Sequence, residues 1–274
     1  MMVIRVKQLF SHPVKGLTPH RETRVDLRAG HGILGDRAFA LLYDLAQSET
    51  QSETASPIVP WMKKKSFAMQ CDRPELAALA CEYEPTTGVL TVRHEDVEML
   101  AAETHTAIGR TQISQFFTDY LTTVSESDIA PRPLRLVGVG DGTTRYPDRE
   151  AMHLSLVSTA TLENLSQVAG QFVDSRRFRP NIVIEGVSAW EEMDWIGKEF
   201  EIGTARIQIA ARLTRCLNIN VHPDTGERDL PLFSMLQETF HHKDTGVLAT
   251  VIQSGIVTVG DCLLRDESIV PLSD

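Results

Sequence analysis

Apolar and polar side chains alternate along residues 205–221, which is the period-two pattern of half-buried strands. The apolar positions are all odd-numbered: Ala205, Ile207, Ile209, Ala211, Leu217, Ile219 and Val221. The pattern predicts extended chain on both sides of Cys216. If the chain runs through without a bulge, Cys216 lies on the polar face beside Thr214 and Arg212. A bulge at residues 213–215 would break this alternation.

Shorter patterns of the same kind predict further strands. They cover residues 2–6, 23–27, 79–83, 90–92, 153–157, 182–184 and 255–261. Apolar residues at helical spacing predict helices at residues 113–121 and 232–240. A third helix should begin after Ser158, a good N-cap residue, and end at Gly170. Because strands outnumber helices, the fold class is predominantly β (α+β) with peripheral helices.

A chain of 274 residues is long enough for one large or two modest domains. The composition changes at residues 125–133, where acidic residues and two prolines interrupt the regular pattern. We therefore expect one domain at residues 1–125 and a second at residues 131–274. Residues 44–60 are polar and repeat the sequence Gln-Ser-Glu-Thr, which predicts a mobile surface loop.

The formal net charge of -10 argues against non-specific nucleic-acid binding, which requires Lys and Arg to neutralise phosphates. Any anion site in this chain must therefore be a local cluster of cations. Arg176, Arg177 and Arg179 precede the strand predicted at residues 182–184, and Asn181 lies between them and that strand. These arginines could form a solvated edge or an anion-binding cluster, and composition does not choose between the two.

The four cysteines, Cys71, Cys81, Cys216 and Cys262, show no C-x-x-C spacing. The lack of C-x-x-C pairs excludes a zinc ribbon or an iron-sulfur motif and favours reduced thiols in a cytosolic protein. Residues 1–10 lack the apolar core of a signal peptide, and no apolar run is long enough to span a bilayer. We therefore expect a cytoplasmic protein that makes no membrane contact.

Cys216 follows arginines at one and four positions before it. Neighbouring positive charge stabilises a thiolate over a thiol and lowers the pKa of a cysteine. A thiolate is the form that acts as a nucleophile or as a ligand for a soft metal. The alternative is a buried cysteine that only packs in the core, which is a common fate of a free cysteine. Both interpretations stay open at this point.

An ordered set of motifs extends along the second half of the chain. It consists of Phe178-Arg179-Pro180-Asn181, residues 195–203, Arg215-Cys216, residues 221–226 (Val-His-Pro-Asp-Thr-Gly), Pro231-Leu232 and residues 255–261. Together these motifs resemble the MOSC domain, the molybdenum-cofactor sulfurase C-terminal domain. Residues 12–16 and 32–37 resemble the beta-barrel extension that precedes this domain in the branch containing the mitochondrial amidoxime-reducing components. The resemblance covers most of the chain except residues 44–70.

The resemblance implies a mixed β-barrel of the MOSC type, in which strands from residues 1–43 join the main barrel and the following segment is an inserted N-terminal subdomain. It also implies a molybdenum cofactor (molybdopterin) whose metal is ligated by Cys216. The family positions that bind the cofactor's phosphate and pterin match Lys15, Arg37, Arg179 and Asn181. Such side chains supply the charge-assisted donors that a phosphate needs. The family's contacts near residues 150–152 are not expected, because the residue types differ.

The activity implied by the resemblance is that of an oxidoreductase that reduces small N-hydroxylated or N-oxide compounds, with Cys216 as the catalytic residue. Electrons would come from a separate ferredoxin-, flavodoxin- or cytochrome-like protein, because the chain shows no flavin or nicotinamide fingerprint. Two alternatives remain open. Cys216 could carry a persulfide for sulfur transfer, or the chain could be a non-enzymatic carrier of the cofactor.

Overall fold

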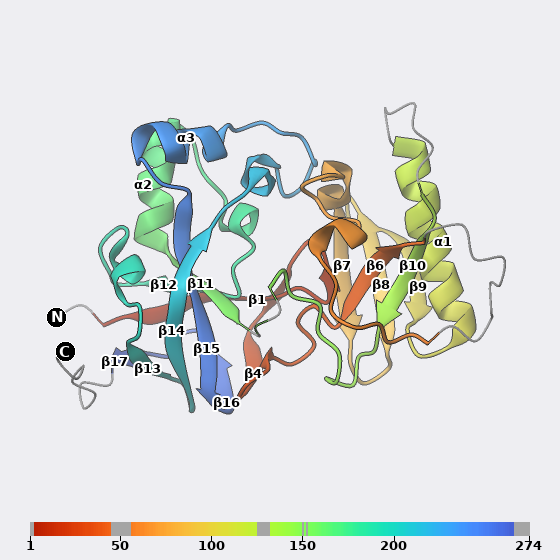
Figure 1. The fold of residues 1–274 in the computed structure, drawn as a ribbon, viewed down its shortest axis with the longest axis horizontal. Coiled ribbons are helices and arrows are strands. Elements are labelled where there is room, and N and C mark those ends of the chain that lie inside the picture. The colour runs from red at the N-terminus through yellow and green to blue at the C-terminus, as the bar shows by residue number, and fades with distance from the viewer. Residues whose placement is uncertain (1–2, 45–55, 125–131, 150, 152, 266–274) are drawn as a thin grey trace.

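The computed structural model describes residues 3–44, 56–124, 132–149, 151 and 153–265 (Figure 1). Most of the loop predicted at residues 44–60 and of the boundary predicted at residues 125–133 lies outside the described residues. The strands are β1 (Arg5–Ser11), β2 (Val14–Lys15), β3 (His20–Glu22), β4 (Arg24–Arg28), β5 (Gly32–Ile33), β6 (Phe39–Tyr43), β7 (Leu79–Glu84), β8 (Val89–His94), β9 (Val97–Glu103), β10 (Leu134–Gly138), β11 (Leu154–Ser158), β12 (Ile182–Glu185), β13 (Glu199–Ile202), β14 (Ala205–Thr214), β15 (Asp244–Gln253), β16 (Gly255–Thr258) and β17 (Leu263–Arg265). The α-helices are α1 (Ala107–Val124), α2 (Thr159–Ala169) and α3 (Leu232–Thr239), and five short 3₁₀ helices complete the described elements.

The largest sheet has eight strands in the order β17-β13-β14-β15-β11-β12-β1-β3. Strands from the two ends of the sequence therefore share one sheet, with β1 antiparallel to β12 and β11 parallel to β12. A second sheet, β16-β4-β5, also pairs an early segment with a late one. Both sheets curl around one apolar core, which contains residues of β1, β4, β14 and β15. The prediction of a mixed, barrel-like β fold with peripheral helices is confirmed.

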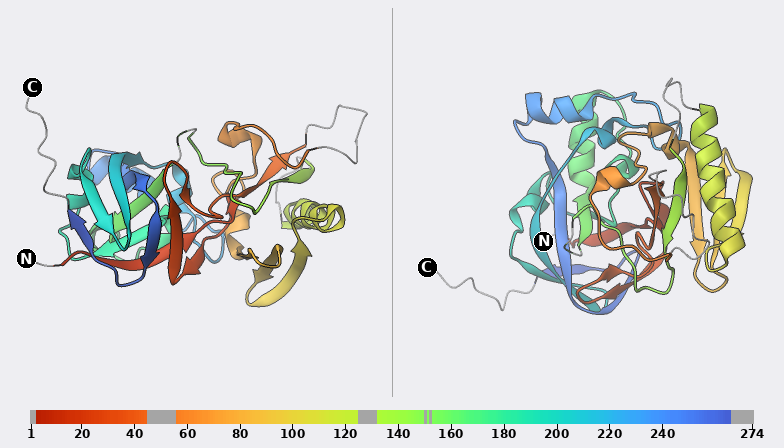
Figure 2. Two further views of the ribbon diagram at one scale, coloured as in Figure 1. Left: turned by 90° about the horizontal axis from the view of Figure 1, so that it is seen from below. Right: turned by 45° about the vertical axis from the view of Figure 1, so that its right-hand side comes forward.

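A second lobe is built from segments between residues 14 and 138. Its sheets are β10-β6-β2 and β7-β8-β9, and α1 packs beside them (Figures 1 and 2). The predicted helical face is correct, because Ile113, Phe117 and Leu121 of α1 are buried in the core of this lobe. The hairpin predicted at residues 79–92 is present as β7 and β8.

Helices α2 and α3 cover the large sheet on the side away from the barrel core, where they form a third apolar cluster. The predicted ends of α2 are confirmed. The Ser158 side chain accepts a hydrogen bond from the Thr161 backbone N–H at the start of the helix. Gly170 ends the helix with φ of 69°, a left-handed conformation that glycine adopts at little steric cost. No helix in the described part of the chain is long and apolar enough to cross a membrane.

Two predicted strands are wrong in position or type. Residues 217–221 do not form a strand, because Leu217–Asn220 are a 3₁₀ helix that leaves the sheet directly after Cys216. Tertiary contacts hold this turn: the Asn220 side chain accepts from the Phe233 N–H at 2.9 Å, and Arg177 donates to the Asn220 carbonyl at 3.3 Å. The strand predicted at residues 2–6 instead runs over β1, where a bulge after Val6 changes the alternation of buried positions.

Candidate functional site

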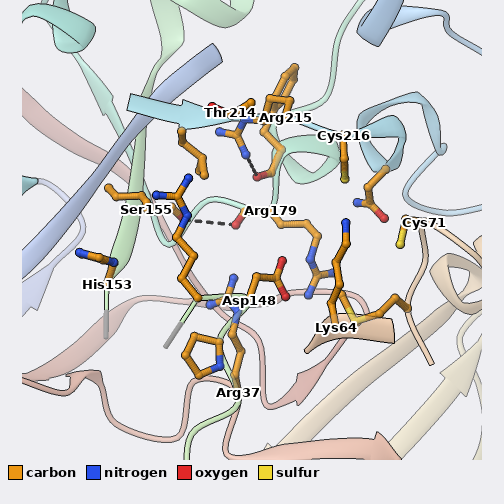
Figure 3. Close-up of a pocket in the computed structure, with 18 of the residues that line it drawn as sticks. Arg37, Lys64, Cys71, Asp148, His153, Ser155, Arg179, Thr214, Arg215 and Cys216 are labelled. Carbon is orange, nitrogen blue, oxygen red and sulfur yellow. Dashed lines mark hydrogen bonds between the residues drawn. The ribbon is translucent and has the colours of Figure 1, made fainter. Parts of the chain in front are cut away.

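A pocket opens between the large sheet and the second lobe (Figure 3). Its lining residues come from β14, from the 3₁₀ helix before β12 (Ser175–Phe178) and from the 3₁₀ helix after Cys216 (Leu217–Asn220). Loops of the N-terminal half and the segment between β10 and β11 complete the lining. Seven cationic side chains line it: Arg37, Lys64, Arg145, Arg149, Arg177, Arg179 and Arg215. Among the described lining residues, Asp148 is the one carboxylate. In a protein of net charge -10, this concentration of cations makes the pocket the candidate site for an anion.

Cys216 lies at one end of this pocket and is exposed. It follows β14, in which register shifts at residues 209–211 and 212–214 end the regular alternation before the cysteine. Arg215 is held beside it by carbonyl groups: its Nη1 donates to Phe178 at 2.7 Å and its Nε donates to Thr245 at 2.9 Å. Burial lowers the pKa of Arg215 to about 9. The buried-core interpretation of Cys216 is therefore wrong for this structure, and a fixed guanidinium accompanies an accessible thiol.

The structure brings Arg37 and Arg179 into the same pocket, although they are distant in sequence. Both have left-handed backbone conformations, with φ of 55° and 49°. This conformation is uncommon for residues other than glycine and is frequent at functional sites. Burial, and then the charge of Arg37, lower the pKa of Arg179 to about 10. Arg179 also donates to the Gln70 Oε1 atom at 3.3 Å and to the Leu17 carbonyl, which connects the two halves of the site.

Asp36 organises the floor of the pocket from a buried position. Its carboxylate accepts from Arg145 at 2.9 Å and from the Asn181 side chain at 3.1 Å, and it forms an ion pair with Arg37. Burial raises the pKa of Asp36, but Arg37, His12 and Arg145 outweigh this effect and hold the pKa well below its usual range. The carboxylate is therefore ionised at neutral pH, and it fixes the direction of two pocket arginines.

Asn181 lines the pocket, but its side-chain amide is already used by the protein. Its Nδ2 group donates to the Phe10 carbonyl and to Asp36, while its Oδ1 atom accepts from the backbone N–H and the hydroxyl of Ser155. A side-chain amide has two donor hydrogens and one acceptor oxygen with two lone pairs, so all its positions are filled. In this structure Asn181 positions Asp36 and the loop that carries Arg179.

Lys15 lies behind the wall of the pocket and is only 1% exposed. Its ammonium donates to the Tyr146 carbonyl at 3.1 Å and forms an ion pair with Asp148, which does line the pocket. Burial lowers the pKa of Lys15. Burial also raises the pKa of Asp148, but Lys15, Arg37 and Arg179 reverse this shift and leave it below its usual value. Lys15 therefore acts on the pocket through Asp148.

The three arginines of residues 176–179 have different roles in the structure. Arg176 pairs with Asp174 at 2.8 Å and Asp224 at 2.6 Å, outside the pocket. Arg177 pairs with Asp229 at 2.6 Å, whereas Arg179 points into the site. Arg176 thus fits the interpretation as a solvated edge, whereas Arg177 and Arg179 belong to the cationic cluster that lines the pocket.

Sequence reasoning missed Lys64, Arg145, Asp148, Arg149 and His153, which also line the pocket. The run of three lysines at residues 63–65 was a visible signal of local positive charge. Residues 143–149 carry no comparable pattern. Their approach to Arg37 depends on backbone pairing such as the hydrogen bond from the Tyr146 N–H to the Arg37 carbonyl at 2.8 Å.

His12 gives the pocket floor a pH dependence that can be measured. Its ring is fully buried against Asp36, and burial, followed by the charges of Arg37 and Arg179, lowers its pKa to about 3. The unfolded chain takes up this proton near pH 6.5, so folding becomes less favourable as the pH falls below that value. We expect the free energy of unfolding to be about 2 kcal/mol lower at pH 5 than at pH 7.5 because of His12 alone.

Urea denaturation of the wild type and of His12→Gln at the two pH values measures this contribution. In His12→Gln, the difference in the free energy of unfolding between pH 7.5 and pH 5 should be smaller than in the wild type by about 2 kcal/mol. His105→Gln is the matched control, because the His105 side chain is 61% exposed, and it should keep the full difference. An unchanged pH dependence in His12→Gln would show that His12 is not the group responsible.

The structure thus defines a barrel-like β protein with an exposed thiol at the end of a cationic pocket. Comparison with known families places it further. The model of the MOSC N-terminal beta barrel domain matches residues 3–132, and the model of the MOSC domain matches residues 141–263. The chain therefore belongs to the MOSC-domain proteins that carry the N-terminal beta barrel domain.

Individual relatives match only parts of the chain. Mitochondrial amidoxime reducing component 2 from Rattus norvegicus is 38% identical over 89 residues, which are 32% of this chain and 25% of the relative. Molybdenum cofactor sulfurase from Oryza sativa subsp. japonica is 44% identical over 55 residues, which are 20% of this chain and 6% of the relative. Among solved structures, the YUAD protein from Bacillus subtilis aligns with a TM-score of 0.43 and 10% identity, covering 96% of this chain and 94% of that one. The matches to these two curated relatives thus span a quarter of their length or less.

Proposed function

We propose that the protein binds a molybdenum cofactor in this pocket and reduces N-hydroxylated or N-oxide compounds there. One observation carries the proposal: an exposed thiol, Cys216, stands in a pocket with seven cationic side chains in a protein of net charge -10. A soft thiolate suits molybdenum, and the arginines suit the phosphate of an anionic pterin. The relatives named as amidoxime-reducing components support the choice of reaction.

The side chains present fit such a cofactor. Arg37 and Arg179 would bind its phosphate, Cys216 would ligate its metal, and Asp148 offers an ionised acceptor for N–H groups of a pterin. His153 also lines the pocket and provides a further polar side chain for a ligand. When bound, the cofactor would supply the redox chemistry of molybdenum.

The chain's own residues hold and orient the reactants. Reduction of an amidoxime to an amidine breaks one N–O bond, consumes two electrons and two protons, and releases water. We propose that the electrons come from a separate redox protein. Arg215, fixed by two backbone carbonyls, keeps a positive charge beside Cys216 throughout this process. The ion pairs of Asp36 keep Arg37 in place, so that little reorganisation is needed when the anion binds.

A second candidate is sulfur transfer, in which Cys216 carries a persulfide without a metal. The similarity to molybdenum cofactor sulfurase favours it, and the same exposed thiol beside Arg215 would serve it. A third candidate is a carrier that binds the cofactor and has no reductase activity. All three use the pocket, but they differ in what Cys216 holds.

Analysis of metal, pterin and mass separates these candidates in protein made by a host that synthesises the cofactor. Reductase function requires molybdenum near one per chain, a bound pterin, and reduction of benzamidoxime with reduced methyl viologen. An added sulfur mass on Cys216 without metal would support sulfur transfer. Tightly bound molybdenum without viologen-dependent reduction would support a carrier.

Arg179→Gln should weaken cofactor retention by about 10- to 100-fold, because a hydrogen bond to a charged group contributes about 1.5–3 kcal/mol. Molybdenum and pterin per chain, measured after gel filtration, report this loss. Arg176→Gln is the matched control, because Arg176 lies in the 3₁₀ helix (Ser175–Phe178) that Arg179 caps, but its partners are Asp174 and Asp224 outside the pocket. Equal cofactor content in both variants would remove Arg179 from the anion site.

A further inference from the structure

The cations of the pocket divide into those that the protein already holds and those that it does not. Five are held by carboxylates or carbonyl oxygens of the protein: Arg37, Arg145, Arg177, Arg179 and Arg215. Among the described residues, the other two, Lys64 and Arg149, have no side-chain hydrogen bond or ion pair with the protein. Their charges are therefore available to a ligand.

Lys64 and Arg149 lie in different parts of the pocket. Lys64, Cys71 and Cys216 all line the pocket. Figure 3 shows them on one side of the pocket. Burial, followed by the charge of Arg149, lowers the pKa of His153, which lies on the opposite side of the pocket in that view. Lys64 is thus the available cation beside Cys216.

The backbone of Lys64 is fixed, although its side chain is exposed. Lys64 opens a 3₁₀ helix (Lys64–Ser66), and its carbonyl accepts from the Phe67 N–H at 3.0 Å. Phe67 is buried, forms a β-bridge with Leu42, and packs on the Tyr146 ring with centroids 5.8 Å apart. A turn anchored in the core therefore presents an exposed ammonium group to the pocket.

We propose that Lys64 forms a subsite for an anionic group of the substrate next to the Cys216 thiol. The compounds reduced at this site then carry a carboxylate or similar anion close to the N–O group. The choice of substrate rests on the proposed function, whereas the anion subsite itself does not require the cofactor. Under the proposed function, Arg37 and Arg179 are fixed in place to bind the cofactor's phosphate, whereas Lys64 at the thiol end selects the substrate.

The subsite can be tested without cofactor, on the full chain from a host that cannot make it. Iodoacetate, an anion, and iodoacetamide, its neutral counterpart, alkylate the same thiolate, so the ratio of their rates at Cys216 is independent of how ionised the thiol is. Peptide mass spectrometry separates Cys216 from the other cysteines. We expect Lys64→Gln to lower the iodoacetate-to-iodoacetamide ratio by about three- to tenfold, and about 0.5 M salt to lower the wild-type ratio in the same direction.

Lys65→Gln is the matched control, because Lys65 is an exposed neighbour in the same helix that does not line the pocket. It should leave the ratio at the wild-type value. An unchanged ratio in Lys64→Gln, or an equal fall in Lys65→Gln, would overturn the subsite. A loss of molybdenum in Lys64→Gln made with cofactor would also overturn it, because Lys64 would then hold the cofactor.

With cofactor present, kcat/KM for 4-carboxybenzamidoxime relative to benzamidoxime measures substrate selection. Reduced methyl viologen serves as donor for both compounds, so any effect on the donor cancels. The wild type should prefer the carboxylate, and Lys64→Gln should lose about three- to tenfold of that preference while Lys65→Gln keeps it. If the wild type reduces neither compound, the proposed function fails, and the alkylation ratio still decides the anion subsite.

Discussion

Cys216→Ser should purify as a folded protein without molybdenum and without amidoxime reduction. Serine is nearly isosteric with cysteine, but its hydroxyl is a poor ligand for a soft metal. Cys216 is exposed, so the substitution should change the free energy of unfolding by only about 0.5 kcal/mol. Metal analysis, viologen-dependent reduction and urea denaturation together measure these three outcomes.

Cys71→Ser and Cys262→Ser are the controls for this prediction. Cys71 also lines the pocket, but burial, followed by the nearby charge of Asp72, raises the pKa of its thiol to about 12. A thiol that stays protonated at neutral pH is a poor metal ligand, so Cys71→Ser should keep its molybdenum. Cys262 lies beside β17, outside the pocket lining. Full molybdenum content and activity in Cys216→Ser would refute the assignment of the metal ligand.

Asp36→Asn should lower the free energy of unfolding by about 3–5 kcal/mol, because it removes the charge that compensates two buried or half-buried arginines. Asp36 and Arg145 are both buried and lie 2.9 Å apart, and Asp36 also pairs with Arg37. Without the carboxylate, Arg145 remains in a buried position with its charge uncompensated. Urea denaturation at pH 7.5 measures the loss.

Glu185→Gln provides the comparison, since Glu185 pairs with Lys7 at 3.1 Å but both side chains are exposed. An exposed ion pair contributes little, so the control should change stability by less than about 1 kcal/mol. The same small loss in Asp36→Asn would mean that Arg37 and Arg145 do not depend on Asp36. Asp36 would then not hold Arg37 and Arg145 in place, as the proposed function assumes.

Local features of the structure could be predicted because their causes lie close together in sequence. The ends of α2 follow from Ser158 and Gly170, whose capping and left-handed conformations act on adjacent backbone groups. The buried face of α1 follows from the spacing of Ile113, Phe117 and Leu121. The same alternation failed at residues 217–221, where contacts with Arg177 and Phe233 favour a 3₁₀ turn over a strand.

For the site, the sequence by itself determined that Arg215 directly precedes Cys216, which keeps a positive charge within one residue of the thiol. The resemblance to the MOSC family added Arg37 and Arg179. Neither the sequence nor the resemblance could show that the Asn181 amide makes all its hydrogen bonds with protein groups. Nor could they show that Lys15 acts on the pocket only through its ion pair with Asp148. Those roles depend on which atoms meet in three dimensions.

Only the tertiary structure decided that Lys64, Arg145 and Asp148 belong to the same pocket as Cys216. These residues come from three separate segments, and no periodic pattern links them in the sequence. The pairing of β1 with β12 and of β6 with β10 brings those segments together. Periodicity and capping act over a few residues, whereas the charge of a pocket is summed over whatever the folded sheets place within a few ångströms.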